Sequence, residues 1–104
     1  MKITKQPVIL IICAGLISVT TACATPAIDK HARNMASSCA ACHGTNGNSV
    51  GGAPVLAGLD KTYFITQMNN FKSGARPATI MNKHAKGYND EEIVQLATFF
   101  AAQK

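Results

Sequence analysis

The sequence predicts an all-α protein with one small domain. No stretch shows the sustained alternation of apolar and polar residues that marks a half-buried β-strand, whereas three segments show helical spacing or helix caps. The chain has 104 residues, of which 47% are hydrophobic and 14% are charged. That length excludes a multidomain enzyme, and that composition argues against a disordered chain.

The first predicted helix spans residues 29–39. Small or apolar side chains recur along it at the i, i+3, i+4, i+7 spacing of one helical face: Ala32, Met35, Ala36 and Cys39. We therefore expect one helix that buries this face and leads directly into the residues that follow Cys39.

Residues 44–58 are predicted to form a loop, because they are rich in turn-forming residues: Gly44, Asn46, Gly47, Asn48, Gly51, Gly52, Pro54 and Gly58. A second helix is expected from Asp60, a favourable N-cap residue, to Gly74. Its apolar face carries Phe64, Met68 and Phe71 at i, i+4, i+7 spacing.

The last predicted helix begins at Asn89. Asn89 and Glu92 have the spacing of a capping box, and Asp90 and Glu91 place negative charge in the first turn, where the helix dipole favours it. Its apolar residues are Ile93, Leu96, Ala97 and Phe100. The stretch before it, residues 74–87, shows no periodicity and is expected to be irregular.

The N-terminal segment is predicted to be an export signal over residues 1–24. A short basic start precedes an apolar stretch over residues 8–19, which is too short for the roughly 20 residues of a membrane-spanning helix. Cleavage after Ala24 would leave residues 25–104 as the mature domain. In the alternative, the signal covers residues 1–22 and Cys23 is lipidated, which would anchor the protein to a membrane.

The formal net charge of +5 does not identify a nucleic-acid or membrane-surface binder, because the chain contains no run of adjacent Lys or Arg residues. Removing residues 1–24 would leave 80 residues with eight basic and five acidic side chains. A domain of that size commonly depends on a disulfide, metal or cofactor for stability.

The sequence Cys39-Ala40-Ala41-Cys42-His43 supplies such a group. Two thiols on one helical turn can form thioethers with the two vinyl groups of a haem, and the imidazole of His43 can then bind the iron from the same side. Covalent attachment would also keep the cofactor in an exported protein. The motif therefore predicts one covalently attached haem c.

Two other uses of the motif remain as alternatives. A thiol-disulfide redox pair is normally found in a βαβ setting, and no strand pattern precedes it here. A zinc site would need four ligands, for which the chain offers Cys39, Cys42, His43 and His84. A disulfide between the two cysteines would close too short a loop to stabilise the domain appreciably.

The second axial ligand of the iron is predicted to be Met81. It lies between two predicted helices and 38 residues beyond His43, which is enough chain to reach the opposite face of the haem. Met68, in the apolar face of the second helix, and His84 remain as alternatives. Met35 is excluded because it lies one turn before Cys39 on the same helix.

Taken together, these residues make the chain resemble a class I c-type cytochrome. The resemblance covers residues 27–102 and includes the Cys-x-x-Cys-His motif, the loop over residues 51–58 and the segments around Met81 and Tyr88. It implies that the N- and C-terminal helices cross, with Phe99 or Phe100 near small residues, and that loops close the haem pocket. It also implies that the carbonyl of Pro54 accepts a hydrogen bond from His43.

Within this family, residues 71–93 are most similar to the cytochrome subunits of flavocytochrome c sulfide dehydrogenases and to related periplasmic cytochromes with one or two haems. The resemblance implies a periplasmic electron carrier, without catalytic residues of its own, whose redox partner is a flavoprotein sulfide dehydrogenase subunit. Arg76 is expected to contact a haem propionate, since a guanidinium matches a carboxylate.

The predicted function is one-electron transfer by Fe(III)/Fe(II) cycling. Four lysines, Lys61, Lys72, Lys83 and Lys86, are expected to attract an acidic partner. The alternative function is a haem protein that binds a gas or another ligand at an open distal position. No nucleic acid is expected as a partner.

Overall fold

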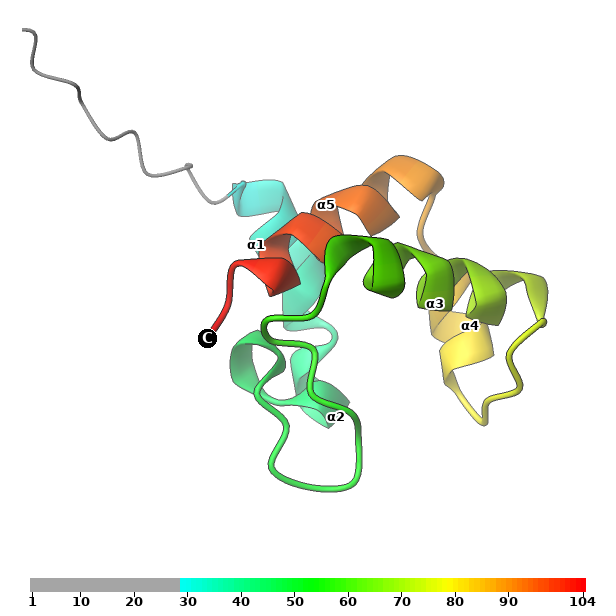
Figure 1. Cartoon of the computed structure of the whole chain (residues 1–104), viewed down its shortest axis with the longest axis horizontal. Helices are drawn as coiled ribbons and strands as arrows, with labels where there is room; N and C mark the ends of the chain where they lie inside the picture. The colour runs from blue at the N-terminus through cyan, green and yellow to red at the C-terminus, as the bar shows by residue number, and fades with distance from the viewer. Residues whose placement is uncertain (1–28) are drawn as a thin grey trace, which may run out of the picture.

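The computed structural model describes residues 29–104 (Figure 1). The predicted export signal over residues 1–24 and the alternative lipidation site Cys23 lie outside these residues. The described part is all-helical and contains no strand, as the sequence predicts. Its elements are α1 (Lys30–Ser37), α2 (Ala40–His43), the 3₁₀ helix η1 (Thr45–Gly47), α3 (Lys61–Ser73), α4 (Met81–Ala85) and α5 (Asp90–Ala101).

The helix predicted over residues 29–39 is shorter in the structure, and a separate short helix follows it. Asp29 caps α1 by accepting a hydrogen bond from the backbone N–H of His31 at 2.9 Å, and α1 ends at Ser37. The chain then turns at Ser38, and α2 begins after Cys39. The continuous spacing of small residues gave no sign of this break.

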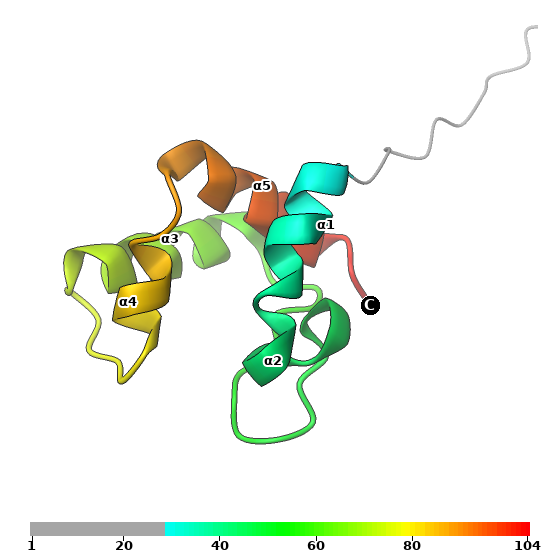
Figure 2. The same cartoon turned by 180° about the vertical axis from the view of Figure 1, so that it is seen from behind.

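Helices α1 and α5 cross, and together they form the centre of the core (Figures 1 and 2). Helix α1 contributes the buried residues Ala32 and Ala36, and the small size of these side chains allows α5 to approach closely. Helix α5 contributes Ile93, Leu96, Ala97, Phe99 and Phe100. The expected crossing of the terminal helices of the domain is therefore confirmed.

Phe100 joins the crossing to α3. Its ring is 1% exposed and stacks on Phe64 with the ring centroids 5.6 Å apart, and it meets Phe99 edge-on at 5.2 Å. Aromatic pairs in these geometries stabilise a core beyond the area that they bury. Phe64 and Met68 are the buried residues of α3, and Phe71 is half-buried.

The predicted bounds of α3 and α5 are confirmed by their caps. Asp60 accepts a hydrogen bond from the backbone N–H of Tyr63 at 2.9 Å, and Gly74 ends α3 in the left-handed conformation with φ of 84°. Both hydrogen bonds of the capping box between Asn89 and Glu92 are present at 2.9 Å. Within residues 29–104, no helix is long and apolar enough to cross a membrane.

The expectation of an irregular stretch over residues 74–87 is wrong, because it contains helix α4. The helix has only five residues, and Ala85, which is fully buried, is its one buried side chain. No side chain caps its start at Ile80. A helix this short shows no apolar periodicity, and packing against α3 holds it in place.

Candidate functional site

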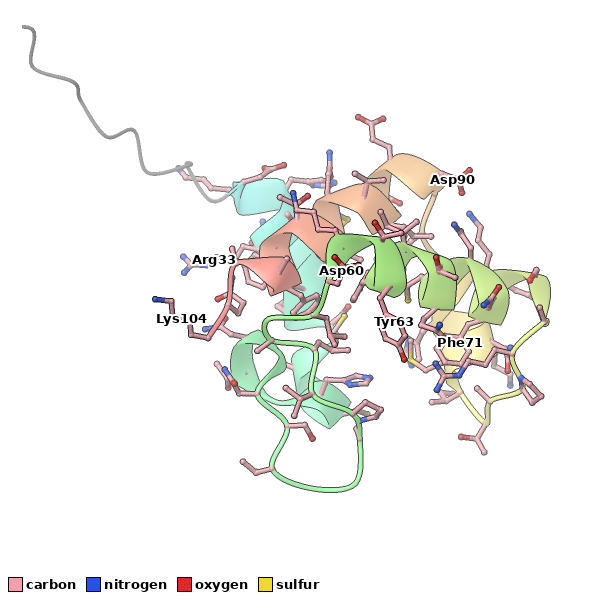
Figure 3. All side chains as sticks on the ribbon, in the orientation of Figure 1. Arg33, Asp60, Tyr63, Phe71, Asp90 and Lys104 are labelled. Atoms are coloured by element: carbon pink, nitrogen blue, oxygen red, sulfur yellow. The ribbon has the colours of Figure 1, made fainter. Side chains whose placement is uncertain are left out.

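A cavity of about 450 Å³ lies between α2 with its following loop on one side and α3 with α4 on the other. This volume is within the usual range of small-molecule sites. In Figure 3 the side chain of Tyr63 extends from α3 toward this space. Residues that line it include Ser38, Cys39, Cys42, His43, Pro54, Tyr63, Gln67, Met68, Phe71, Arg76, Ile80, Met81, His84 and Tyr88.

The two cysteines are one helical turn apart and both line the cavity. Cys39 precedes α2, and its carbonyl accepts hydrogen bonds from the backbone N–H groups of Cys42 at 3.3 Å and His43 at 2.9 Å. Both thiols are free rather than joined in a disulfide. Burial raises the pKa of the Cys39 thiol. Cys42 is exposed at the edge of the site.

His43 is oriented by the loop that faces it. Its Nδ1 lies 2.7 Å from the backbone oxygen of Pro54, so the contact that the resemblance implied is present. A carbonyl oxygen can only accept, so Nδ1 carries the proton and Nε2 keeps a free lone pair. Such an imidazole is prepared to bind a metal through Nε2.

Gly44 allows the loop to return beneath His43. Its φ is 78°, and a Cβ at this position would lie 2.4 Å from the backbone oxygen of Asn48. Helix α2 therefore ends at His43 and the chain reverses. The loop is held by hydrogen bonds from the backbone N–H groups of Leu56 and Ala57 to the carbonyl of Gly47, at 2.8 and 3.2 Å.

Met81 lies on the other wall, as the first residue of α4. Met68 lines the same wall from α3 but is buried in the core cluster. His84 also lines the cavity, because it lies three positions after Met81 on the same face of α4. Met35 packs against the core and does not line the cavity.

Arg76 lies at the rim of the cavity and is held by two residues of α3. Its Nη1 donates a hydrogen bond to Oε1 of Gln67, and its guanidinium lies 4.7 Å from the centroid of the Phe71 ring. Sequence reasoning missed Gln67 and Tyr63. Their four-residue spacing with Phe71 places all three along one side of α3, and that spacing was the available signal.

Of the four lysines expected to attract a partner, Lys72 has a partner within the chain. Its Nζ lies 3.0 Å from Oδ1 of Asp90, which joins the end of α3 to the start of α5. Exposed ion pairs stabilise a fold only slightly, but this one offsets the positive charge of Lys72. The local charge available to a partner therefore comes mainly from the other three lysines, Lys61, Lys83 and Lys86.

The four-ligand zinc site considered from the sequence is not assembled. Among residues 29–104, no group of three or more His, Cys, Asp and Glu side chains is placed to hold a metal ion. Cys39, Cys42 and His43 lie on one wall of the cavity and His84 on the other.

The sequence matches those of known proteins. The Cytochrome c family model matches residues 30–104. The chain belongs to the cytochrome c family. It is therefore an electron-carrier haem protein, and its cofactor is covalently bound haem c. The residues at the cavity fit this group, because they provide two free thiols, an imidazole with a bare Nε2 and a largely apolar cavity between two walls.

Several curated cytochromes and electron-acceptor proteins are similar to this chain. The cytochrome subunit of sulfide dehydrogenase from Chlorobaculum tepidum is 41% identical over 75 residues, which cover 72% of this chain and 68% of the relative. The thiosulfate dehydrogenase electron acceptor of Thiomonas intermedia is 39% identical over 83 residues, and cytochrome c4 of Pseudomonas aeruginosa 37% identical over 67 residues. The matched residues span only 38% and 33% of those two relatives.

Proposed function

We propose that this cytochrome carries single electrons through one haem c, attached by thioethers to Cys39 and Cys42, with His43 and Met81 as the axial ligands of the iron. The main support is geometric. One wall of the cavity carries the two thiols and the bare Nε2 of His43, and the facing wall carries the thioether of Met81.

When bound, the haem supplies an iron that alternates between Fe(III) and Fe(II). The protein holds the ligands in place around it. The carbonyl of Pro54 fixes the ring orientation and tautomer of His43. This hydrogen bond also raises the basicity of Nε2, which makes the imidazole a stronger ligand for the iron. A thioether from Met81 favours the ferrous state and would occupy the position that a gas needs. Phe64, Met68 and Phe71 line the cavity with apolar side chains and so exclude water.

We further propose that Arg76 contacts a haem propionate. Its position at the cavity rim supports this role, since Gln67 and Phe71 hold the guanidinium where a carboxylate of the cofactor would reach the surface. A guanidinium held in place loses less freedom when it forms charge-assisted hydrogen bonds.

The partner that we propose is a flavoprotein sulfide dehydrogenase, met after export to the periplasm. The relative from Chlorobaculum tepidum is named as the cytochrome subunit of sulfide dehydrogenase. Residues 25–104 would form the mature cytochrome domain, which is free after cleavage at Ala24 or anchored through Cys23. Cys42 and Ala41 are exposed, so a partner could approach the attachment edge through a small, transient interface.

Absorption spectra of the haem-loaded protein test the ligand assignment. The ferric protein is expected to show the weak thioether-to-iron band at the red edge of the spectrum, and the ferrous protein is expected not to bind carbon monoxide. Met81→Ala should abolish the band and allow carbon monoxide to bind. His84→Ala is the matched control from the same face of α4 and should change neither property. Rapid binding to the unmodified ferrous protein would favour the ligand-binding alternative.

Stopped-flow reduction by a purified flavoprotein sulfide dehydrogenase tests the partner. We expect sulfide-dependent haem reduction that slows as the ionic strength rises, because salt screens the attraction between Lys83 or Lys86 and an acidic partner. Lys83→Glu should slow reduction, whereas Lys30→Glu, on the distant helix α1, should change it less. Absence of sulfide-dependent reduction at low salt would overturn this partner while leaving the electron-carrier function intact.

A further inference from the structure

The cavity has two walls that come from different parts of the fold. The attachment wall comprises the lining residues from Ser38 to Leu56, and the methionine wall comprises those from Tyr63 to Tyr88. Helix α2 packs against α1 and η1, whereas α4 packs against α3. The separation of the two walls therefore decides how far Met81 lies from the Cys-x-x-Cys-His motif.

One side-chain hydrogen bond joins these walls. Oγ of Ser38 lies 2.8 Å from the hydroxyl oxygen of Tyr88, fifty residues later in the chain. Among the hydrogen bonds of residues 29–104, no other joins residues 38–56 to residues 61–88. Both partners line the cavity.

The direction of this hydrogen bond follows from the local contacts. Ser38 Oγ carries one proton, which it donates to the backbone oxygen of Met35 at 2.8 Å. Oγ can then only accept from Tyr88, so the tyrosine hydroxyl is the donor. Ser38 is thereby fixed at both sides, immediately before Cys39.

Tyr88 is fixed to α4 by backbone hydrogen bonds. Its backbone N–H donates to the carbonyl of Ala85 at 3.3 Å, and that of Gly87 donates to the carbonyl of His84 at 3.0 Å. Ala85 is fully buried, and the Tyr88 ring packs against the core. A displacement of α4 would therefore carry the Tyr88 ring with it.

We propose that Tyr88 is a positioning residue, whose hydrogen bond to Ser38 holds α4 at the distance from Cys39 at which Met81 can bind the iron. This inference rests on the proposed ligand role of Met81. Without the bond, α4 would separate more readily from the attachment wall. Met81 would then leave the iron more often, and an external ligand would reach it faster.

The rate of carbon monoxide binding to the ferrous protein measures that opening. Tyr88→Phe keeps the ring and removes the donor, and Ser38→Ala removes the acceptor. Each is expected to raise the binding rate roughly threefold to tenfold, the effect of losing one hydrogen bond. The double variant should equal either single variant, because both remove the same interaction.

Ser37→Ala is the matched control. Ser37 Oγ also donates to a backbone oxygen within α1, that of Asn34 at 2.6 Å, but Ser37 does not line the cavity. The Ser37→Ala variant should leave the rate of carbon monoxide binding unchanged. The ferric thioether band gives a second measurement, and we expect it to disappear at a lower temperature in Tyr88→Phe and Ser38→Ala than in the unmodified protein.

The outcomes separate this inference from the function on which it rests. If the unmodified protein lacks the thioether band and binds carbon monoxide at once, Met81 is not the ligand and the proposed function fails. If the unmodified protein keeps the band but Tyr88→Phe and Ser38→Ala both behave like Ser37→Ala, the ligand assignment stands and the positioning role of Tyr88 is wrong.

Discussion

Asn82 Nδ2 donates a hydrogen bond to the backbone oxygen of Phe71 at 2.9 Å, and thereby ties α4 to the end of α3. The same nitrogen donates to the backbone oxygen of Arg76 at 3.1 Å. One amide thus satisfies two carbonyls of the turn that leads to Met81. A short helix without a side-chain cap gains its position from contacts of this kind.

Asn82→Ala should therefore lower the free energy of unfolding by about 1–3 kcal/mol, because it removes both hydrogen bonds and leaves the Phe71 carbonyl only the longer one from the backbone N–H of Gly74, at 3.3 Å. Asn82→Asp should cost more, since a carboxylate cannot donate to either oxygen and adds repulsion. Denaturant unfolding of the haem-loaded protein measures both. Asn69→Ala, at an exposed position of α3, is the control. If Asn82→Ala and Asn82→Asp were equally stable, the role of Asn82 as a hydrogen-bond donor to the two carbonyls would be wrong.

A series of glycine substitutions should rank in a set order of cost. Gly47 has φ of 81°, and a Cβ there would meet Leu56, Ala57 and Phe100 at 2.8–2.9 Å. Gly47→Ala combines strained backbone with overpacking, and we expect a loss of about 2–4 kcal/mol in unfolding free energy. Gly52 shares the positive φ but has open space around it, so Gly52→Ala should cost about 1–2 kcal/mol.

Gly51→Ala completes the series. Gly51 has neither a positive φ nor an atom within 4 Å of an added Cβ, so the change should stay within about 0.5 kcal/mol. Denaturant unfolding of the three variants gives the ranking directly. A Gly47→Ala protein as stable as Gly51→Ala would show that the loop and Phe100 do not pack as described.

The sequence predicted the parts of the fold that local chemistry determines. Helices α3 and α5 carry their caps at Asp60, Gly74 and Asn89, so their bounds could be read from residue type. The attachment motif could be found because the spacing of Cys39, Cys42 and His43 is itself the chemical requirement. These features need only a few neighbouring residues.

Features that depend on distant residues could not be predicted in this way. Helix α4 has no periodicity of its own and is held by Asn82 and by packing on α3. The Ser38–Tyr88 hydrogen bond joins residues far apart in the chain, and no local pattern marks either partner. The contact of His43 with Pro54 was expected only because the chain resembles a known family.

The capping box of α5 should contribute measurably to stability. Asn89 accepts from the backbone N–H of Glu92, and the Glu92 carboxylate accepts from that of Asn89. Asn89→Ala should lower the unfolding free energy by about 1 kcal/mol, whereas Asn89→Gly should lower it by only about 0.3 kcal/mol. Thermal unfolding compares the two variants, and a larger loss for glycine would contradict the capping role.

Arg76 should raise the reduction potential of the haem. A cation near the cofactor opposes the extra positive charge of ferric iron and so favours the ferrous state. The substitution Arg76→Gln removes an electrostatic interaction of about 1 kcal/mol with the haem. We therefore expect potentiometric titration to show that the reduction potential falls by an amount on the order of tens of millivolts. Arg33→Gln makes the same charge change on α1, away from the cavity, and should shift the potential less. Equal shifts in the two variants would show that Arg76 acts only through net charge and does not contact a propionate.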